Sequence, residues 1–229
     1  MRAFVILLAI GLGSAAPCHA IVDYRPKILL HIGNVTVKNQ CTTLPRNCVD
    51  AVSRGQLDTN YFAYVVVAPG DSLAASGDGI AGVQFGIDYT GAYAPNGGEP
   101  GVNIFSWTLC ATLEFPTPVP AWPNRGSGNL ITWDVTNNCQ LGAVTSPGYF
   151  YMAAYQTGIL CIVPRHVDNS AKVATCQVKE ILFPAYQTLA VAAFSPGGVN
   201  QGCNPCQYPC FIDPVEPSTW SRIKATIGR

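Results

Sequence analysis

The clearest pattern of hydrophobic and polar positions lies between Tyr61 and Tyr89. Residues 61–68 form an unbroken apolar run, rich in β-branched and aromatic side chains. After a Gly-, Ser- and Asp-rich break at 69–79, apolar residues occupy every second position from 81 to 89. The first run predicts a strand covered on both faces, and the second predicts a strand with one buried face. We expect the two strands to form a central antiparallel pair.

Strand-like patterns recur along the rest of the chain. They cover residues 27–32, 102–109, 111–115, 130–135, 149–155, 159–163, 172–176, 178–182 and 189–194. The short Gln156-Thr157-Gly158 connection predicts that the strands on either side of it form a hairpin. A short helix is expected at 45–54, because Pro45 suits a first helical turn and Gly55 a position just past the end.

About ten strands with no long amphipathic helix predict an all-β fold. The expected architecture is an antiparallel two-sheet β-sandwich of the Ig-like, cohesin-like or jelly-roll-like type, with one short helix and a C-terminal tail. Composition agrees, because 22 glycines and 18 prolines in 229 residues suit short strands joined by many turns. Lys and Arg number 13, as do Asp and Glu, so no basic surface for nucleic acid is expected.

Residues 1–20 have the features of a secretory signal peptide. Arg2 precedes an apolar stretch at 3–12, and Cys18-His19-Ala20 forms a small-x-small cleavage site. The apolar stretch is too short to span a membrane, so no transmembrane segment is expected in the mature chain. We expect the mature chain to begin at Ile21 and to be secreted to the extracellular space or the cell envelope.

The cysteines agree with export, because disulfides persist in oxidising compartments. Nine follow the leader: Cys41, Cys48, Cys110, Cys139, Cys161, Cys176, Cys203, Cys206 and Cys210. Their order along the chain suggests the local pairs Cys41–Cys48, Cys110–Cys139 and Cys161–Cys176, with one more bond among the last three. The odd count leaves one cysteine unpaired or bonded to another chain, unless the leader is cut earlier.

The composition of the chain changes after residue 197, where turn-forming residues and cysteines replace the apolar strand patterns. The expected organisation is a signal peptide at 1–20, a β-sandwich domain at 21–197, a Cys/Pro-rich linker at 198–217 and a Trp-containing tail at 218–229. In the tail, Trp220 and Ile223 fall on one side of a short helix, and Lys224 contributes to its basic character. We expect Trp220, Ile223 and Lys224 to contact either the domain itself or a partner.

Gly70-Asp71-Ser72-Leu73 resembles the nucleophile block of the GDSL esterases and lipases. The resemblance implies Ser72 as nucleophile, assisted by a histidine and an aspartate in an Asp-x-x-His pair. The late histidine of this chain, His166, has Val163 in the aspartate position, and the Gly-x-Asn-Asp block is absent. A polar turn is therefore the favoured interpretation, and a serine esterase using Ser72 is the alternative.

Two groups of residues could hold a metal ion. Asp71, Asp78 and Asp88 could offer oxygens to calcium, although their spacing matches no EF-hand and solvated turn aspartates are commoner. Cys203, Cys206 and Cys210 have ligand-like spacing, but a structural zinc site needs four ligands and export favours disulfides. His31 and His166 are isolated in the sequence. No cofactor is expected, with calcium as the alternative.

The tryptophans could serve either a core or a sugar-stacking platform. Trp107 and Trp133 lie in alternating patterns that favour the core. Trp122 lies in a Pro-rich loop, at 116–123, and is the one expected to be exposed.

Two resemblances extend this interpretation. GDGIAGVQFGIDYTGAY, at 77–93, is similar to an early strand of cohesin-type β-sandwich modules. More broadly, IAGVQFGIDY, SWTLCATLEFP, GNLITWD-x4-CQ, GYFYMAAY, KVATC and TWSRIKA resemble an uncharacterised family of secreted β-rich proteins from environmental bacteria. That resemblance implies export and a shared fold, and its recurrent Trp-containing end suggests a sorting or assembly segment.

The expected function is that of a secreted, non-enzymatic structural or interaction protein. Its partner would be another protein, a cell-envelope component or further copies of the chain, and not nucleic acid. The alternatives are a secreted carbohydrate-binding module, which binds a glycan, and the esterase that uses Ser72.

Overall fold

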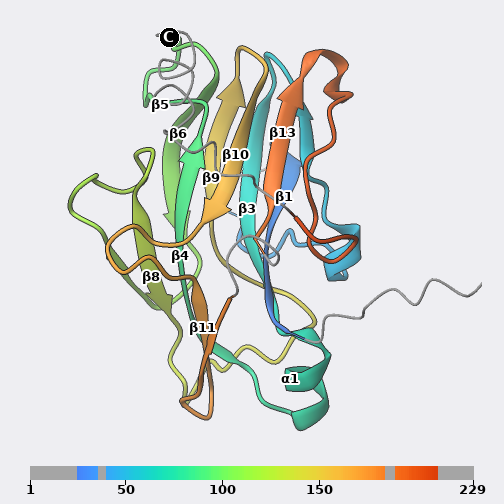
Figure 1. Ribbon diagram of the computed structural model, residues 1–229, viewed down its shortest axis with the longest axis vertical. Coiled ribbons are helices and arrows are strands. Elements are labelled where there is room, and N and C mark those ends of the chain that lie inside the picture. The colour runs from blue at the N-terminus through green and yellow to red at the C-terminus, as the bar shows by residue number, and fades with distance from the viewer. Residues whose placement is uncertain (1–24, 36–39, 184–188, 211–229) are drawn as a thin grey trace, which may run out of the picture.

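The computed structural model describes residues 25–35, 40–183 and 189–210. Within them, two β-sheets pack against each other, and the α-helix α1 (Gly70–Ser76) lies at one end of the molecule (Figure 1). The expected all-β, two-sheet sandwich is confirmed, and its short helix is α1, at a different place from the helix expected at 45–54. None of the described helices is long and apolar enough to cross a membrane.

One sheet has five strands in the described residues. Their order is β1 (Lys27–Asn34), β3 (Asn60–Ala68), β9 (Thr145–Ala154), β6 (Val102–Leu109) and β5 (Gly91–Tyr93). Neighbouring strands are antiparallel except at the edge, where β5 runs parallel to β6.

The other sheet has eight strands in the same part of the chain. Its main path is β12 (Glu180–Leu182), β11 (Lys172–Thr175), β4 (Ile80–Tyr89), β10 (Gly158–Val163), β13 (Val191–Ser195) and β2 (Arg54–Gln56). The opposite edge of β4 pairs with β8 (Gly128–Thr132), which in turn pairs with β7 (Leu113–Pro116). Because β4 is long, its first half pairs with β11 and its second half with β10.

The main hydrophobic core lies between the two sheets. Alternate residues of β4, including Val83, Phe85 and Ile87, are fully buried there beside Val65 and Phe150 of the five-stranded sheet. Full burial of one such side chain contributes about 1.5–3 kcal/mol to stability. The period-two pattern in the sequence thus identifies the inward-facing side of β4 correctly.

A second hydrophobic cluster covers the outer face of the five-stranded sheet. It contains Phe62, Tyr64 and Tyr149, against which Leu44 and Cys206 pack. Strand β3 is therefore buried on both faces, as its unbroken apolar run predicts.

The expected central pairing is wrong, because the two strands belong to different sheets. Strand β3 pairs with β1 and β9, whereas β4 pairs with β8, β10 and β11. The break at 69–79 is not a simple turn, since it contains α1, which ends at Gly77 with a left-handed φ of 67°. A connection of this length crosses from one sheet to the other instead of closing a hairpin.

Two other local predictions are wrong for related reasons. Strands β9 and β10 do not form a hairpin, because each lies in a different sheet. The helix expected at 45–54 shrinks to the 3-10 turn η1 (Cys48–Asp50). The backbone that follows is drawn into the eight-stranded sheet, where Ser53 O accepts a hydrogen bond from Ala193 N at 3.0 Å and β2 runs parallel to β13.

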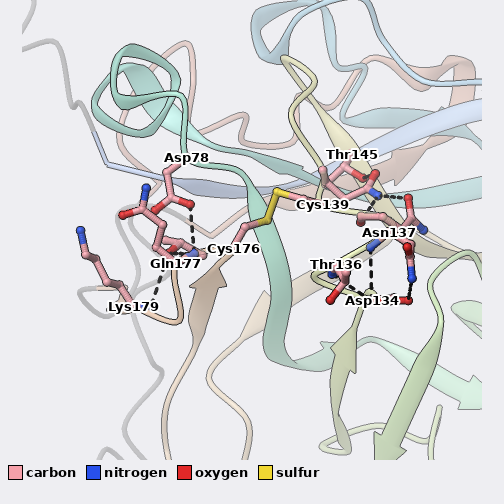
Figure 2. The surroundings of a disulfide bond; sticks show 12 residues. Asp78, Asp134, Thr136, Asn137, Cys139, Thr145, Cys176, Gln177 and Lys179 are labelled. Carbon is pink, nitrogen blue, oxygen red and sulfur yellow. Dashed lines mark hydrogen bonds between the residues drawn. A yellow bond between two sulfur atoms is a disulfide. The ribbon is translucent and has the colours of Figure 1, made fainter.

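Four disulfides join the described residues, with Cys161 left as a free, buried thiol. They are Cys41–Cys110, Cys48–Cys206, Cys139–Cys176 and Cys203–Cys210. The three local pairs expected from cysteine order are therefore wrong. Bonds spanning 69 and 158 residues tie down the cover of the five-stranded sheet, while Cys139–Cys176 joins two loops beside the start of β4 (Figure 2).

Residues 198–210, which composition assigns to a linker, pack against the sandwich. Cys203 exchanges backbone hydrogen bonds with Val191, and Asn204 Nδ2 donates to Cys48 O at 3.0 Å. The packed domain therefore continues at least to Cys210. The leader at 1–20, the rest of the linker and the tail at 218–229 lie outside the described residues.

Candidate functional site

The outer surface of β7, β8, β4, β11 and β12 carries two adjacent rows of residues, which we name the exposed apolar face. The first row runs across the strands as Phe115, Leu130, Gln84, Lys172 and Leu182. The second row runs as Leu113, Thr132, Gly82, Ala174 and Glu180. Residues in register at alternate strand positions share one side of a sheet, so both rows lie on the same surface.

The residue between Leu113 and Phe115 shows which side of β7 faces solvent. Glu114 turns inward, where its Oε2 accepts hydrogen bonds from Trp107 Nε1 at 3.0 Å and Asn129 Nδ2 at 2.7 Å. Its two neighbours must therefore point outward, and they are 56% and 52% exposed. At the other side of the face, Leu182 is 63% exposed. Large apolar side chains thus stand at both edges of this surface.

A shallow depression of about 40 Å³ lies in the middle of the face. Gly82 forms part of its floor, since this residue has no side chain to fill the space between Thr132 and Ala174. The depression is large enough for a small apolar group and too small for a metabolite. Its size favours contact with a macromolecular surface.

The exposed apolar face is electrically neutral. Lys172 and Glu180 are the charged residues of the two rows, and they pair with each other at 2.9 Å between Nζ and Oε1. A surface pair of this kind contributes at most about 1 kcal/mol to stability. Because the two charges already pair within one molecule, a partner that binds over this face would not bury an unpaired charge.

A loop at 164–170 closes one side of the face. Gln84 Nε2 donates to Asp168 Oδ2 at 2.8 Å and to Ser170 Oγ at 2.7 Å, so this side chain is buried under the loop. Further along, Arg165 lies against Gly128, where a Cβ atom would come 2.6 Å from its Cγ. The loop at 164–170 thus limits the exposed apolar face on one side, and β7 and β12 are the strands at its two edges.

The calcium candidates are not brought together. Asp88 Oδ1 pairs with Arg125 Nε at 2.6 Å, and Asp78 Oδ1 accepts a hydrogen bond from Gln177 N at 3.3 Å (Figure 2). Asp71 lies on α1. Among the described residues, no three His, Cys, Asp or Glu side chains are grouped so as to hold a metal ion.

The zinc candidates are used in disulfides. Cys203 bonds to Cys210, and Cys206 bonds to the distant Cys48. None of the three thiols is therefore available as a metal ligand.

The residues of the esterase alternative fall on separate elements. Ser72 lies in α1, while His31 is on β1 and His166 is in an exposed turn. The Nδ1 atom of His31 accepts a hydrogen bond from Val52 N at 3.1 Å, and burial lowers the pKa of this imidazole. In the described part of the chain, neither histidine pairs with an acidic residue.

The prediction that Trp122 is exposed is wrong. Its ring is half-buried and packs edge-on against Trp107, with ring centroids 5.1 Å apart, and against Phe85 at 5.7 Å. Trp133 is buried in the core as well. These rings extend the hydrophobic core. Contacts between aromatic rings add stability beyond that of burying their apolar surface.

The expected partner-binding residues Trp220, Ile223 and Lys224 lie outside the described residues. The sequence did not single out the residues of the exposed apolar face. The alternation at 111–115 correctly separates Leu113 and Phe115 from Glu114, yet a pattern cannot tell which of the two sides is covered.

Comparisons with known proteins give a distant structural likeness. No protein-family model and no curated protein sequence matches the chain. The fold is similar to a cohesin module from a Clostridium perfringens family 33 glycoside hydrolase, with a TM-score of 0.42 and 7% identity over 76% of this chain and 98% of that one.

It is also similar to the sixth cohesin of Acetivibrio cellulolyticus scaffoldin B, solved in complex with a Cel5 dockerin. There the TM-score is 0.41 and the identity 10%, over 74% of this chain and 99% of the other. These findings agree with the cohesin-type resemblance expected from residues 77–93. At such values the likeness carries no conclusion about function.

Proposed function

We propose that this chain is a secreted, non-enzymatic structural protein that assembles with other copies of itself through the exposed apolar face. The observation that carries the proposal is a surface over five paired strands at whose two edges Leu113, Phe115 and Leu182 stand in solvent. Contiguous exposed apolar surfaces mark sites of interaction, whereas single exposed apolar residues do not.

The charges of the chain favour a second copy as the partner. The protein has a formal net charge of zero, and only 11% of its residues are charged, so two copies do not repel each other at long range. The Lys172–Glu180 pair is satisfied within one copy, so an interface would not bury an unpaired charge. Neither copy needs to supply a charged side chain to neutralise the other.

The chemistry of β7 favours contact through the face over pairing at the strand edge. The strand has four residues and ends at Pro116, which has no backbone N–H to donate. Pro118 and Pro120 follow, so the edge cannot be extended as a ladder. At the β7 edge, self-association would therefore stack sheets and would not join them side by side.

Sedimentation velocity over a range of concentrations tests the proposal. We expect wild-type protein to self-associate reversibly, and the double substitution Phe115→Glu/Leu182→Glu to raise the dissociation constant at least about tenfold. Val49→Glu is the matched control, since Val49 is exposed on η1, outside the face. Circular dichroism establishes that each variant is folded.

A wild-type protein that stays monomeric at every concentration overturns the proposal. So does an association that the double substitution leaves unchanged while the variant remains folded. If neutral apolar surfaces drive assembly, added salt should not dissociate it, because only ionic contacts are screened.

A further inference from the structure

A cleft of about 470 Å³ is lined by residues outside the exposed apolar face. Figure 1 shows β1 and β13, which run on this side of the sandwich. The cleft is bounded by the end of β1, by β2, by the start of β3 and by the turn η2 (Pro196–Gly198). Its volume falls in the range of about 300–1,000 Å³ that is usual for small-molecule sites.

The floor of the cleft is backbone that admits no side chain. At Gly55, a Cβ atom would come within 2.8 Å of the Phe194 ring and 2.9 Å of the Tyr61 ring. Two consecutive residues of η2, Gly197 and Gly198, have φ values of 66° and 64°, which glycine adopts without strain. A side chain at Gly55 would therefore clash with two core rings, and one at Gly197 or Gly198 would strain the turn.

Hydrogen bonds fix the walls in place. The turn after β13 is closed by Asn200 N, which donates to Ser195 Oγ at 2.9 Å. On the opposite wall, Gln56 N donates to the Tyr61 hydroxyl at 2.9 Å. This hydrogen bond joins the end of β2 to the start of β3.

The cleft carries one positive charge without a counter-ion. Arg54 lines it and is exposed, and its guanidinium forms no ion pair or hydrogen bond with any described residue. None of the described residues that line the cleft carries a carboxylate. A guanidinium presents a planar fork of donors that matches a carboxylate in a bidentate arrangement. The electrostatics therefore favour an anionic ligand.

The other lining groups suit hydroxyl groups and aliphatic C–H surfaces. Asn34 and Gln56 contribute primary amides, each of which both donates and accepts, as a sugar hydroxyl does. Val52 and Val199 are 43% and 70% exposed and give the cleft apolar sides. An apolar ligand would leave the amides unused, and a cation would be repelled by Arg54.

We propose that this cleft binds an acidic saccharide, namely a short pyranose chain that carries a carboxylate. Arg54 holds the carboxylate, Asn34 and Gln56 hydrogen-bond to ring hydroxyls, and the valines contact the C–H faces of the rings. The site is independent of the exposed apolar face, so one copy could bind a glycan while it associates with another copy.

Isothermal titration calorimetry with digalacturonate as the probe tests the site, and its neutral methyl ester serves as the matched ligand. We expect saturable binding of the acid at one site per chain, and at least about tenfold weaker binding of the ester. Arg54→Gln should weaken binding of the acid by a similar factor. Arg46→Gln, at an exposed arginine outside the cleft, should bind like wild type.

Equal binding of acid and ester, or an Arg54→Gln variant that binds like wild type, overturns the proposal. Absence of saturable binding up to about 10 mM does the same, and so does inorganic sulfate competing as well as digalacturonate, which indicates a general anion site. The Phe115→Glu/Leu182→Glu variant should retain the affinity for digalacturonate. That result separates the fate of this site from the fate of the proposed assembly.

Discussion

Two titratable side chains, the half-buried His31 and the buried Cys161, show how the surroundings of a residue set its chemistry. Burial, with a smaller effect from the nearby Asp88, raises the pKa of the Cys161 thiol to about 12, so this thiol stays protonated and unreactive at neutral pH. Burial acts in the opposite direction on His31, because it disfavours the charged imidazolium and lowers the pKa. Sequence reasoning found both residues but could not say how far each side chain is buried.

His31 makes the stability of the fold depend on pH. The unfolded chain protonates this side chain near pH 6.5, and the folded chain does so only at lower pH. Between these two values the unfolded state binds more protons. Stability from neutral His31 is therefore fully present above about pH 6.5 and is lost as the pH falls towards the folded-state pKa.

We expect the free energy of unfolding to fall between about pH 7 and pH 5, and to fall less in His31→Asn. Asparagine does not titrate, and its carbonyl can accept the Val52 N–H bond that His31 Nδ1 accepts in the wild type. Urea unfolding at several pH values measures the difference. Parallel pH profiles for the two proteins would contradict this account.

At the scale of elements, the start of β4 depends on Gly79, which packs against Cys139. Figure 2 shows the Cys139–Cys176 disulfide. A Cβ atom at Gly79 would overlap Cys139 Sγ and come 2.7 Å from Gln140 O. The same residue holds β4 to the disulfide loop, since Gly79 O accepts a hydrogen bond from Cys176 N at 2.9 Å. The backbone at Gly79 is thus packed so closely against the disulfide loop that no side chain fits there.

Gly79→Ala should therefore destabilise the protein by about 1–3 kcal/mol, the usual cost of overpacking. Gly33→Ala on β1 is the matched control, because a Cβ atom there meets its nearest neighbour, Tyr64 Cε2, at an ordinary 3.4 Å. Chemical denaturation of the two variants gives the comparison. Equal midpoints would show that the loop at 139–141 moves aside freely.

The patterns of single elements were predictable in a way that their pairings were not. The alternation in β4 and the apolar run in β3 identify two strands correctly. Strands β3 and β4 lie in opposite sheets for two reasons. The segment that contains α1 is long enough to cross between the sheets, and other strands occupy the positions beside β3 and β4. A local pattern contains neither fact.

At the scale of the whole molecule, the exposed apolar face and the Arg54 cleft lie on different parts of one sandwich. Both are built from strands that are far apart in sequence, such as β7 with β12 and β2 with the turn after β13. The segment at 218–229 adds a third feature, proposed from its sequence to act in sorting or assembly.

Deleting residues 218–229 should leave the fold intact and change localisation or assembly. The described domain already closes its core and its four disulfides without this segment. Circular dichroism and the unfolding midpoint report on the fold, and cell fractionation with sedimentation velocity reports on the rest. Unaltered secretion and unaltered association of the deletion variant would count against a role for the tail.

The sequence by itself determined what local chemistry controls: the strand periodicity, the side of β4 that is buried, the all-β class and the abundance of cysteine. Only the tertiary structure decided which strands pair, which cysteines bond and which apolar residues stay in solvent. Alternation follows from the backbone of one strand, whereas the cover over a face is supplied by residues up to 158 positions away, as Cys48–Cys206 shows. Leu113 and Phe115 are as apolar as the core residues, yet within the described part of the chain they remain exposed to solvent.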